Sequence, residues 1–551
     1  MVDFVTACTL NCTAALRRWQ LAYGSGICTA SSELKMGLYF DSWMTELFVV
    51  LSVASFTLYL WFDRAYKYWK NKGVPYVEPS IPFGNVQKCL LGQQTLPDWA
   101  YDLYKQLPGG RFIGFYSFRR PHLLVRDPDL IRHILVKDSS TFVDRGFFID
   151  DEEPLNYNLF LLGGHKWRQL RVKLTPTFTS GKLKGMFKTL QVCGEQMVEA
   201  LQEPAARAGV VEIRELAARF TTDIIASVAF GIEVDSQRHP DNEFRQWGRK
   251  VFEPSVPGYL AVVMSFLNPE IMNLLRFKGG AAAISHYFRR MVRETVNYRE
   301  EKNVSRKDFL ELLIQLKNKG YVDVDKGDDG ELNGTADVSK LTMDEVAAQA
   351  FIFFAAGFET SSSTISFTLF ELAHNISLQN KLQEEIDSVL KEEGDITYES
   401  IAKMTYLDKV VSETLRKYPP LAFLNRECNK DYQVPGSDLV LEKGSTVLVS
   451  TLGLHRDPEY FPDPERFDPE RFTEEEKARR HPYVYLPFGE GPRICIGMRL
   501  GLLQTKVGLV YILSKYNLRT VEHTPSKLDF HSRSFILLSK SGIHLRLEKR
   551  K

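Results

Sequence analysis

The feature that most restricts how this chain can fold is a glycine-rich segment around one cysteine near the C-terminus, FGEGPRICIG at 488–497. Three glycines and a proline within ten residues predict a tight, irregular turn. The run Met498–Leu513 has a helical pattern, and its positive N-terminal dipole would point at Cys495. Such a setting suits a metal-binding thiolate, which must be deprotonated, shielded from bulk water and given N–H donors. Taken alone, a cysteine among glycines is usually a small buried apolar residue.

The other cysteines indicate a reducing compartment for the main body. Of the seven cysteines, four lie beyond residue 62, far apart and without a C-x-x-C pair. This pattern argues against a disulfide framework and a zinc ribbon. The formal net charge of +1 gives no overall attraction to nucleic acid, so no nucleic-acid partner is expected.

An apolar run near the N-terminus predicts a membrane anchor. LFVVLSVASFTLYLWF at 47–62 is somewhat short of the ~20 residues of a spanning helix, and Trp43 and Met44 extend it. Lysines, arginine and aromatic residues follow at 64–72, which predicts that the body faces the cytoplasm. A cleaved signal or a buried core helix would show a similar run. Because Asp63 and Arg64, rather than small residues, follow Phe62, we expect a retained anchor.

The chain divides into four expected parts: an extension at 1–43 to which we assign no function, the anchor at 44–62, a basic and proline-rich hinge at 63–85, and one large domain at 86–551. Helical patterns dominate that domain, with strand-like pieces at 122–127, 446–452 and 534–539. The polar segment 316–342 is typical of a solvated surface loop. The expected fold class is therefore mainly α with a minor β part.

A long helical segment at 342–375 is the second candidate for chemistry. It opens with TMDE, which is typical of a capping box. The motif AGFET at 356–360 places a glycine in its middle, at a cost of about 1 kcal/mol relative to alanine. Small residues let a flat ligand approach the helix, and the acid and alcohol at Glu359 and Thr360 could pass protons into a buried pocket. The alternative is a buried helix whose threonine bonds back to its own carbonyl groups.

Two further patterns combine charged and aromatic residues. Glu413 and Arg416 share one helix face just before Pro419-Pro420, and the sequence PERF occurs twice beyond them, at 464–467 and 469–472. Such an ion pair is normally a surface pair worth little. WRQLR at 167–171 places an indole and a guanidinium one helical turn apart, which alone would indicate a core tryptophan and a solvated arginine.

Taken together, these motifs resemble those of the cytochrome P450 superfamily. F-G-x-G-x-R-x-C-x-G is similar to its haem-binding loop, A-G-x-E-T to its oxygen-activating helix, and W-x-x-x-R, E-x-x-R and P-E-R-F to its remaining elements. They occur in the family's order over roughly residues 44–548. Stretches such as PTFTSGKLK at 176–184 and KYPPLAFLNREC at 417–428 look most like the insect microsomal family six.

The resemblance implies the cytochrome P450 fold, with haem b buried between the long helix and the cysteine loop. It implies a haem-thiolate monooxygenase that inserts one oxygen atom of O2 into a lipophilic substrate, such as a xenobiotic, a plant toxin or an endogenous lipid. Electrons would come from NADPH through NADPH-cytochrome P450 reductase, with cytochrome b5 as a further candidate donor, because the chain has no flavin or nicotinamide fingerprint. The implied location is the endoplasmic reticulum membrane, with the catalytic domain in contact with lipid and facing the cytoplasm.

The resemblance also assigns roles to residues. Cys495 is the implied axial ligand of the haem iron, and Glu359 and Thr360 are the implied catalytic proton relay. Arg471, rather than Arg466, is expected to join Glu413 and Arg416 in a buried network. The remaining implied haem contacts are Arg145, Trp167, Arg171, Ala356, Gly357, Arg426, Phe488, Arg493 and Gly497.

Three alternatives remain open at this point. A haem-thiolate isomerase or dehydratase would need no proton relay, so the Glu359–Thr360 pair argues against it. A non-enzymatic haem sensor or carrier would show no NADPH-dependent turnover. A membrane-tethered helical protein without haem would show no Soret band.

Two surfaces can also be anticipated. The substrate pocket is expected to draw its walls from 142–161, 257–277, 351–356, 421–424 and 534–538, whose apolar content predicts a lipophilic ligand. The reductase is expected to bind where positive charges gather near the cysteine loop, at Lys166, Arg168, Arg479, Arg480 and Arg499.

Overall fold

The computed structural model describes residues 43–106, 108–206, 209–253, 255–275, 282–322 and 339–550. The expected extension at 1–43 and most of the expected loop at 316–342 lie outside these residues. Two compact units make up the chain, Met1–Trp61 and Phe62–Lys551.

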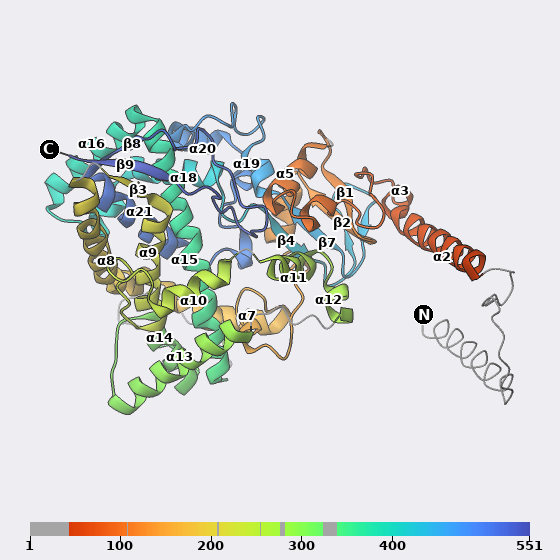
Figure 1. Cartoon of the computed structure of the whole chain (residues 1–551), viewed down its shortest axis with the longest axis horizontal. Coiled ribbons are helices and arrows are strands. Elements are labelled where there is room, and N and C mark those ends of the chain that lie inside the picture. The colour runs from red at the N-terminus through yellow and green to blue at the C-terminus, as the bar shows by residue number, and fades with distance from the viewer. Residues whose placement is uncertain are drawn as a thin grey trace, which may run out of the picture. The chain divides into compact units, whose positions relative to one another are not determined.

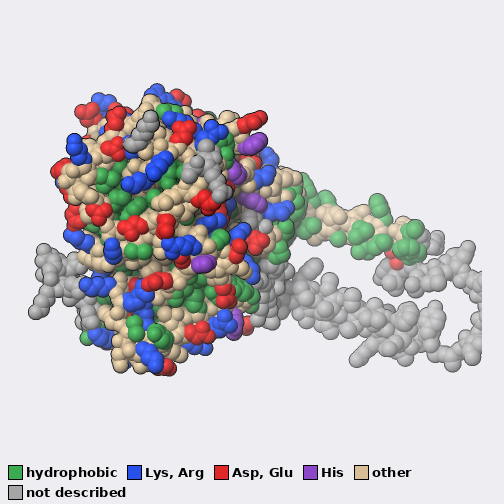
Figure 2. Space-filling model, turned by 60° about the vertical axis from the view of Figure 1, so that its left-hand side comes forward, with side chains coloured by type: hydrophobic (Ala, Val, Ile, Leu, Met, Phe, Trp, Pro, Cys, Tyr) green, Lys and Arg blue, Asp and Glu red, His purple; other side chains and the backbone are tan. Residues whose placement is uncertain are grey.

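The described part of the first unit is most of helix α2 (Trp43–Tyr66). Apolar side chains surround this helix and are exposed, as Phe48 (72%) and Phe56 (62%) illustrate; Figure 2 shows them covering it. A helix that is apolar on all sides needs an apolar surrounding. Among the described residues, one helix is long and apolar enough to cross a membrane, and α2 forms most of it. The helix therefore fits the predicted membrane anchor.

The second unit is mainly helical, and α15 (Met343–His374) occupies its middle (Figure 1). The predicted capping box is present: the Thr342 hydroxyl accepts from the Glu345 N–H, and the Glu345 carboxylate accepts from the Thr342 N–H. Helix α15 packs against α9 (Ile213–Ile225) and α21 (Met498–Leu513). The bounds of α21 are those predicted from the sequence.

The second unit contains further described helices, some of them beside these three and some beside the sheet strands β1 (Phe112–Ser117) and β2 (Arg120–Val125) (Figure 1). They are α3 (Tyr68–Asn71), α4 (Gln87–Leu90), α5 (Leu96–Gln106), α6 (Pro128–Arg132), α7 (Gly164–Leu174), α8 (Ser180–Ala206), α10 (Glu243–Phe252), α11 (Val256–Leu267), α12 (Pro269–Leu275), α13 (Ala282–Lys302), α14 (Phe309–Asn318), α16 (Ile376–Glu393), α17 (Tyr398–Lys403), α18 (Thr405–Lys417), α19 (Thr451–His455) and α20 (Glu474–Arg479). Short 3-10 and π segments are η1 (His133–Lys137), η2 (Pro154–Asn156), η3 (Thr175–Phe178), η4 (Ala226–Phe230), η5 (Pro469–Phe472), η6 (Pro482–Val484) and η7 (Gly491–Arg493).

Three small sheets complete the described fold. The largest has the strand order β1-β2-β7-β4, with an antiparallel β1–β2 pair, a parallel β2–β7 pair and an antiparallel β4–β7 pair. The others have the orders β3-β9-β8 and β5-β6. The strands are β1 (Phe112–Ser117), β2 (Arg120–Val125), β3 (Val210–Glu212), β4 (Leu424–Glu427), β5 (Tyr432–Gln433), β6 (Val440–Leu441), β7 (Thr446–Val449), β8 (Tyr516–Thr520) and β9 (His544–Lys549). The prediction of a mainly α fold with a minor β part is confirmed.

One expected strand is absent. The piece 534–539 forms no ladder beyond a single bridge between Phe530 and Ser539. Its Phe535 and Ile536 line an internal cavity instead. An apolar run can therefore be buried without a strand partner.

The second unit has two apolar cores, one among the helices and one beneath the β1-β2-β7-β4 sheet. Trp69 belongs to the sheet core: it is 1% exposed, its indole N–H donates to the Phe115 carbonyl at 3.2 Å, and a Cβ at Gly114 would clash with its ring. Backbone bonds between Gly114 and both Pro75 and Val77 continue this contact. The proline-rich segment therefore lies along strand β1.

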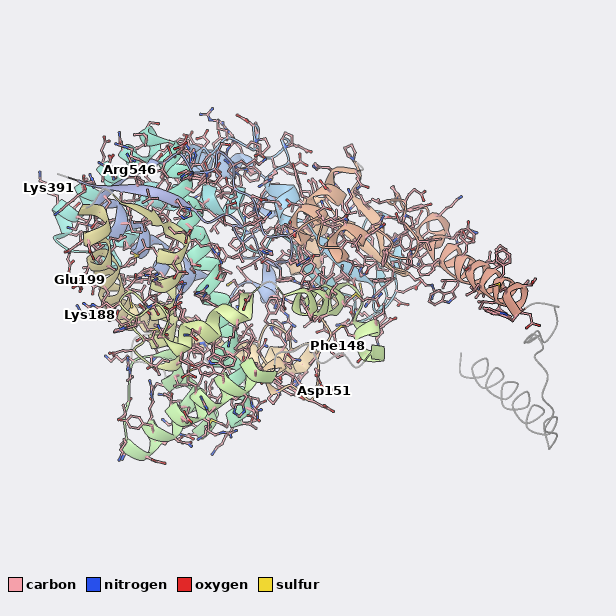
Figure 3. The ribbon with its side chains drawn as sticks, viewed as in Figure 1. Phe148, Asp151, Lys188, Glu199, Lys391 and Arg546 are labelled. Carbon is pink, nitrogen blue, oxygen red and sulfur yellow. The ribbon has the colours of Figure 1, made fainter. Side chains whose placement is uncertain are left out.

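The outer surface carries both signs of charge. Lys188, Glu199, Lys391 and Arg546 are exposed and lie at the periphery (Figure 3). On the face in Figure 2, acidic and basic side chains alternate. This agrees with the net charge of +1.

Candidate active site

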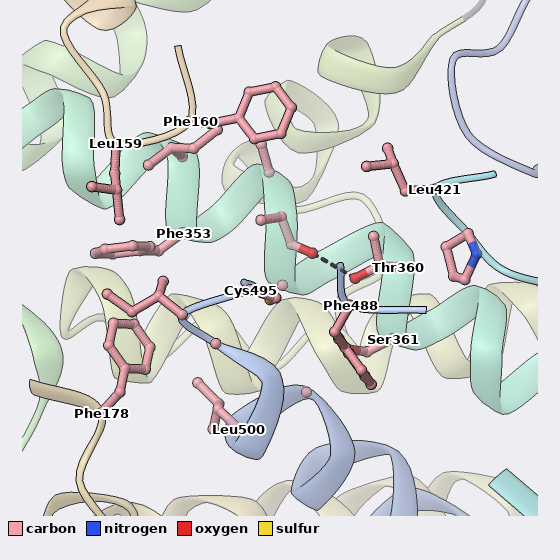
Figure 4. A pocket seen from close by; sticks show the side chains of 18 of the residues that line it. Leu159, Phe160, Phe178, Phe353, Thr360, Ser361, Leu421, Phe488, Cys495 and Leu500 are labelled. Carbon is pink, nitrogen blue, oxygen red and sulfur yellow. Dashed lines mark hydrogen bonds between the residues drawn. The ribbon is translucent and has the colours of Figure 1, made fainter. Parts of the chain in front are cut away.

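A cavity of about 390 Å³ lies between α15 and the cysteine loop at 488–497. Figure 4 shows Cys495 between the ribbon of α15 and the start of α21, and Phe353 and Thr360 of α15 line the same cavity. The side chain of Cys495 is open to this cavity. The cavity therefore brings the two strongest sequence motifs to one place.

The backbone of the cysteine loop depends on its glycines. Gly491 has φ +74°, and a Cβ there would clash with the carbonyl oxygen of Leu135. The Cys495 N–H donates to the Phe488 carbonyl at 3.0 Å, which closes the turn. Burial raises the pKa of Cys495, while the Gly497 N–H and the positive charges of Arg171 and Arg145 act in the opposite direction. The loop therefore supplies one backbone N–H donor, that of Gly497, of the kind that a buried thiolate needs.

Four arginines converge on the same cavity: Arg145, Arg171, Arg426 and Arg493. Arg171 donates to the Ile494 carbonyl at 2.9 Å, Arg145 to Phe160 at 2.7 Å and Arg426 to its neighbour Asn425 at 2.7 Å.

Arg493 donates to three backbone carbonyls, those of Val143, Leu159 and Leu162. Among the residues that the structure describes, none of the four arginines has a carboxylate within ion-pair distance.

The lowered pKa values of three of these arginines show the electrostatic cost of placing them close together. Burial, followed by the charge of Arg426, lowers the pKa of Arg493 to about 9, and burial lowers the pKa of Arg426 to about 10. Burial and the charges of Arg426 and Arg493 also lower the pKa of Arg145. Buried like charges without counter-ions are expensive. The site is therefore built for an anion.

The middle of α15 presents Ala356, Gly357 and Thr360 to the cavity. The Thr360 hydroxyl donates to the Ala356 carbonyl at 2.6 Å, which is the back-bonded arrangement that the sequence left open (Figure 4). A Cβ at Gly357 would lie 2.7 Å from Cδ1 of Ile225. The glycine therefore also permits close packing of α15 on α9.

Glu359 does not line the cavity. It is 2% exposed and forms an ion pair with Arg214 of α9 at 3.1 Å. Burial raises the pKa of Glu359, and the charge of Arg214 opposes this. The acid and the alcohol of the motif therefore point in different directions.

Comparison with known proteins identifies the family. The sequence matches the Cytochrome P450 family over residues 77–546. The chain belongs to the cytochrome P450 family. It is 42% identical over 515 residues to Cytochrome P450 6k1 of Blattella germanica (92% of this chain, 97% of that protein) and 42% identical over 511 residues to Cytochrome P450 6a2 of Drosophila melanogaster (91% and 99%). The predicted resemblance to the superfamily and to its insect family six is confirmed.

The protein is therefore a P450 monooxygenase, and members of its family bind haem through a cysteine thiolate. The cavity fits that group on its own chemistry. It offers one thiol, Cys495, at the start of a helix, and four arginines, of which Arg426 and Arg493 are buried, that lack carboxylate partners among the described residues. The two propionates of haem b are anions of the kind that such a cluster requires.

The structure brings together most of the residues that the sequence singled out. All ten expected haem contacts line the cavity. Their individual roles stay predictions, because the lining alone does not show what each residue binds.

The predicted walls are partly right. Phe160, Phe353, Leu421 and Phe535 line the cavity as expected, but no described residue of 257–277 does. Phe252 of α10, which precedes that stretch in the sequence, does line the cavity. Within the stretch 257–277, α11 instead packs on the sheet core through residues such as Val263, Phe266 and Leu267.

The distances between Glu413, Arg416 and Arg471 agree with the predicted charged network. Glu413 and Arg416 have no solvent exposure and form an ion pair at 2.7 Å, and Arg471 lies 3.6 Å from Glu413. Arg466 has a side chain 68% exposed. Arg471 is therefore the third member of the network.

Sequence reasoning missed several lining residues, namely Ser361, Thr364, Gln504 and Thr505, and the partner Arg214. Gln504 and Thr505 had only a weak signal, because they are uncharged polar positions in a mainly apolar helix, α21, that also carries Arg499 and Lys506.

Proposed function

We propose that this P450 oxidises lipophilic small molecules with electrons from NADPH, delivered by NADPH-cytochrome P450 reductase, at the endoplasmic reticulum membrane. Cytochrome b5 is a further candidate donor. The observation that carries the substrate class is the wall of the cavity above Cys495, which is formed mainly by apolar side chains such as Phe160, Phe252 and Phe353. An apolar ligand would leave few polar groups of this wall without partners.

Each residue that lines the cavity near Cys495 would have its own role in holding the haem. Cys495 would ligate the haem iron, which when bound supplies the reductive activation of O2. Arg145, Arg171, Arg426 and Arg493 would hold the propionates, with Trp167 packed beneath Arg493. Ala356 and Gly357 would keep α15 close to the haem, and Phe488 and Gly497 would shape the loop around the sulfur.

Thr360 and Glu359 are proposed to serve proton delivery in different ways. Thr360 faces the cavity, and because its hydroxyl donates to Ala356, its lone pairs remain acceptors for a water. Glu359 faces Arg214, which is partly exposed, with 31% of its side chain accessible. Glu359 would therefore connect the helix with solvent on the α9 side rather than act inside the cavity.

The apolar helix α2 and the basic residues around its C-terminal end support the location. The exposed apolar surface of α2 fits a lipid bilayer, and Arg64, Lys67 and Lys70 follow directly on the side expected to remain in the cytoplasm.

The test uses the full-length protein in membranes with the reductase, NADPH and a panel of lipophilic compounds. The expected result is an oxidised product that carries label from ¹⁸O2 and not from labelled water. A Cys495→Ser variant at equal protein level is the control. Turnover of no compound by the haem-loaded protein, with the reductase shown to reduce it, would contradict the proposal.

A further inference from the structure

A segment that belongs to no helix or strand, residues 157–162, forms part of the cavity wall. Leu159 and Phe160 of this segment line the cavity, and Figure 4 shows both beside the ribbon of α15. Because the segment has no helical or strand neighbours to pair with its backbone, its N–H and C=O groups need partners from side chains. These partners therefore determine the position of this part of the wall.

Gln349 of α15 bonds to this segment with both ends of its amide. The side chain has no solvent exposure, and its Oε1 accepts from the Leu159 N–H at 2.9 Å. Its Nε2 donates to the Tyr157 carbonyl at 2.9 Å and to the Glu345 carbonyl of its own helix at 3.2 Å. Both ends of the amide are therefore in use, and together they tie the segment to one turn of α15.

The Leu159 N–H and the Tyr157 carbonyl depend on this amide. Among the residues that the structure describes, no other group bonds to either of them. A buried backbone group without a partner is unfavourable, so a protein without this amide has to move the segment to find new partners. The bonds of Gln349 therefore hold the segment in its observed place.

The other bonds of the segment come from its own Asn158 and from arginines that we expect to face the haem. Arg145 donates to the Phe160 carbonyl at 2.7 Å, and its guanidinium carbon lies 4.0 Å from the centroid of the Phe160 ring. Arg493 donates to the carbonyls of Leu159 and Leu162. The link from the segment to α15 through the glutamine does not depend on these arginines.

We propose that Gln349 is a positioning residue for the substrate wall. Its amide holds the backbone of 157–159 on α15, which sets how far the Phe160 ring extends over the cavity and thus the size of the lipophilic compound that fits. Gln349 itself does not line the cavity, so it acts through Leu159 and Phe160. This inference rests on the proposed monooxygenase function.

The first test measures the binding of two azole probes to the haem-loaded full chain by the shift of the Soret band. Imidazole is small enough to bind the iron alone, whereas the chain of N-dodecylimidazole also contacts the walls. Gln349→Leu should weaken N-dodecylimidazole by about four- to fifteenfold, as for one or two methylene groups that lose their contacts, and imidazole by less than about twofold.

Gln379→Leu is the matched control. Gln379 of α16 also has no solvent exposure, its Oε1 accepts from the Leu518 N–H at 2.8 Å, and its Nε2 donates to the carbonyls of Leu372 and Leu518. Neither leucine lines the cavity. Both glutamine variants should lower the unfolding temperature, but Gln379→Leu should leave the affinity for both probes unchanged.

Two further measurements separate positioning from a purely structural role. Hydrogen exchange of the Leu159 N–H should be faster in Gln349→Leu and unchanged in Gln379→Leu. Phe160→Ala removes the ring that Gln349 positions, so Gln349→Leu should weaken N-dodecylimidazole by a smaller factor in that background than in the wild type. A purely structural glutamine would have the same effect in both backgrounds.

The outcomes are distinct. Unchanged affinity for N-dodecylimidazole in Gln349→Leu, an equal loss for both probes, or independent effects of Gln349→Leu and Phe160→Ala would overturn the role of Gln349. If Gln349→Leu does not fold, Gln349→Ser leaves room for water to satisfy the two backbone groups. It should show the same loss for N-dodecylimidazole alone, and wild-type affinity there would also overturn the role. Absence of NADPH-dependent product in the wild type, with these binding results obtained, would instead contradict the proposed function.

Discussion

The guanidinium of Arg493 lies over the indole of Trp167, with 4.0 Å between its central carbon and the ring centroid. Arg493 comes from the cysteine loop and Trp167 from α7, so the contact joins two distant parts of the chain. The donors of this arginine go to backbone carbonyls, which offer only partial negative charge. Arg493 is thus a buried cation, and a full negative charge to balance it has to come from the ligand.

Removing one of these buried charges should have opposite effects on the stability of the haem-free protein and on haem binding. Arg426→Met removes one buried charge that has no carboxylate partner, so the haem-free protein should gain about 1 to 3 kcal/mol of stability. The same variant should retain less haem during dialysis. Arg245→Met is the control, because Arg245 is buried but paired with Glu215 at 2.7 Å; it should lower stability. A parallel loss of stability and haem in Arg426→Met would contradict the account.

The Glu413–Arg416–Arg471 network should behave as a buried charge cluster. Glu413→Gln leaves both guanidinium groups without their carboxylate, which should cost about 3 kcal/mol of folding free energy. Glu476→Gln breaks the exposed pair with Arg479 and should change stability by less than about 1 kcal/mol. Unfolding temperatures and yields of folded protein measure the difference, and equal effects would mean that the network carries no special stability.

Stability should fall in mild acid because of His455. Its Nε2 accepts from the Leu486 N–H at 2.9 Å, and burial, followed by the charge of Arg416, lowers its pKa to about 3. Below pH ~6.5 the unfolded chain binds a proton that the folded protein refuses, so stability falls by about 1.4 kcal/mol per pH unit from this group.

The measurement is the unfolding temperature of the full chain between pH 7 and about pH 4. His455→Gln keeps an acceptor for Leu486 but does not titrate, so its slope should be shallower. His239→Gln, at an exposed position, should keep the wild-type slope. Identical slopes in all three proteins would exclude His455 as the cause.

Two arginines that we expect to bind the reductase, Arg479 and Arg480, differ in their exposure to solvent. Arg479 is exposed, with 74% of its side chain accessible, but Arg480 lies over Phe461 and donates to the carbonyls of Tyr460 and Arg471. Arg479→Glu should therefore slow reductase-driven turnover, most at low salt, and spare peroxide-driven turnover. Arg480→Glu should lower both through loss of folding. If Arg479→Glu lowers both rates equally, it does not report on reductase binding.

Local signals in the sequence predicted much of the fold. The capping box at Thr342, the apolar period of Met498–Leu513 and the glycines around Cys495 each act over a few residues, and the structure has all three. The absent strand at 534–539 shows the limit, since a short apolar run is equally compatible with a buried loop.

The direction of side chains was harder to predict. Adjacent residues of a helix point about 100° apart, so the motif alone does not show whether Glu359 or Thr360 faces the cavity. Which of the two faces inward depends on the packing of α15 against α9 and α21. The hydrogen bond from Gln504 of α21 to the Gly357 carbonyl of α15 depends on the same contact and could not be predicted from the sequence of α21 alone.

The most direct test of the account is the spectrum of Cys495→Ser. The wild-type protein, reduced and exposed to carbon monoxide, should show the strongly red-shifted Soret band of a thiolate-ligated haem. Cys495→Ser should lose this band, while Cys428→Ser, at a buried cysteine outside the cavity lining, should keep it. Persistence of the red-shifted band in Cys495→Ser would show that another residue ligates the iron, and the central claim would be wrong.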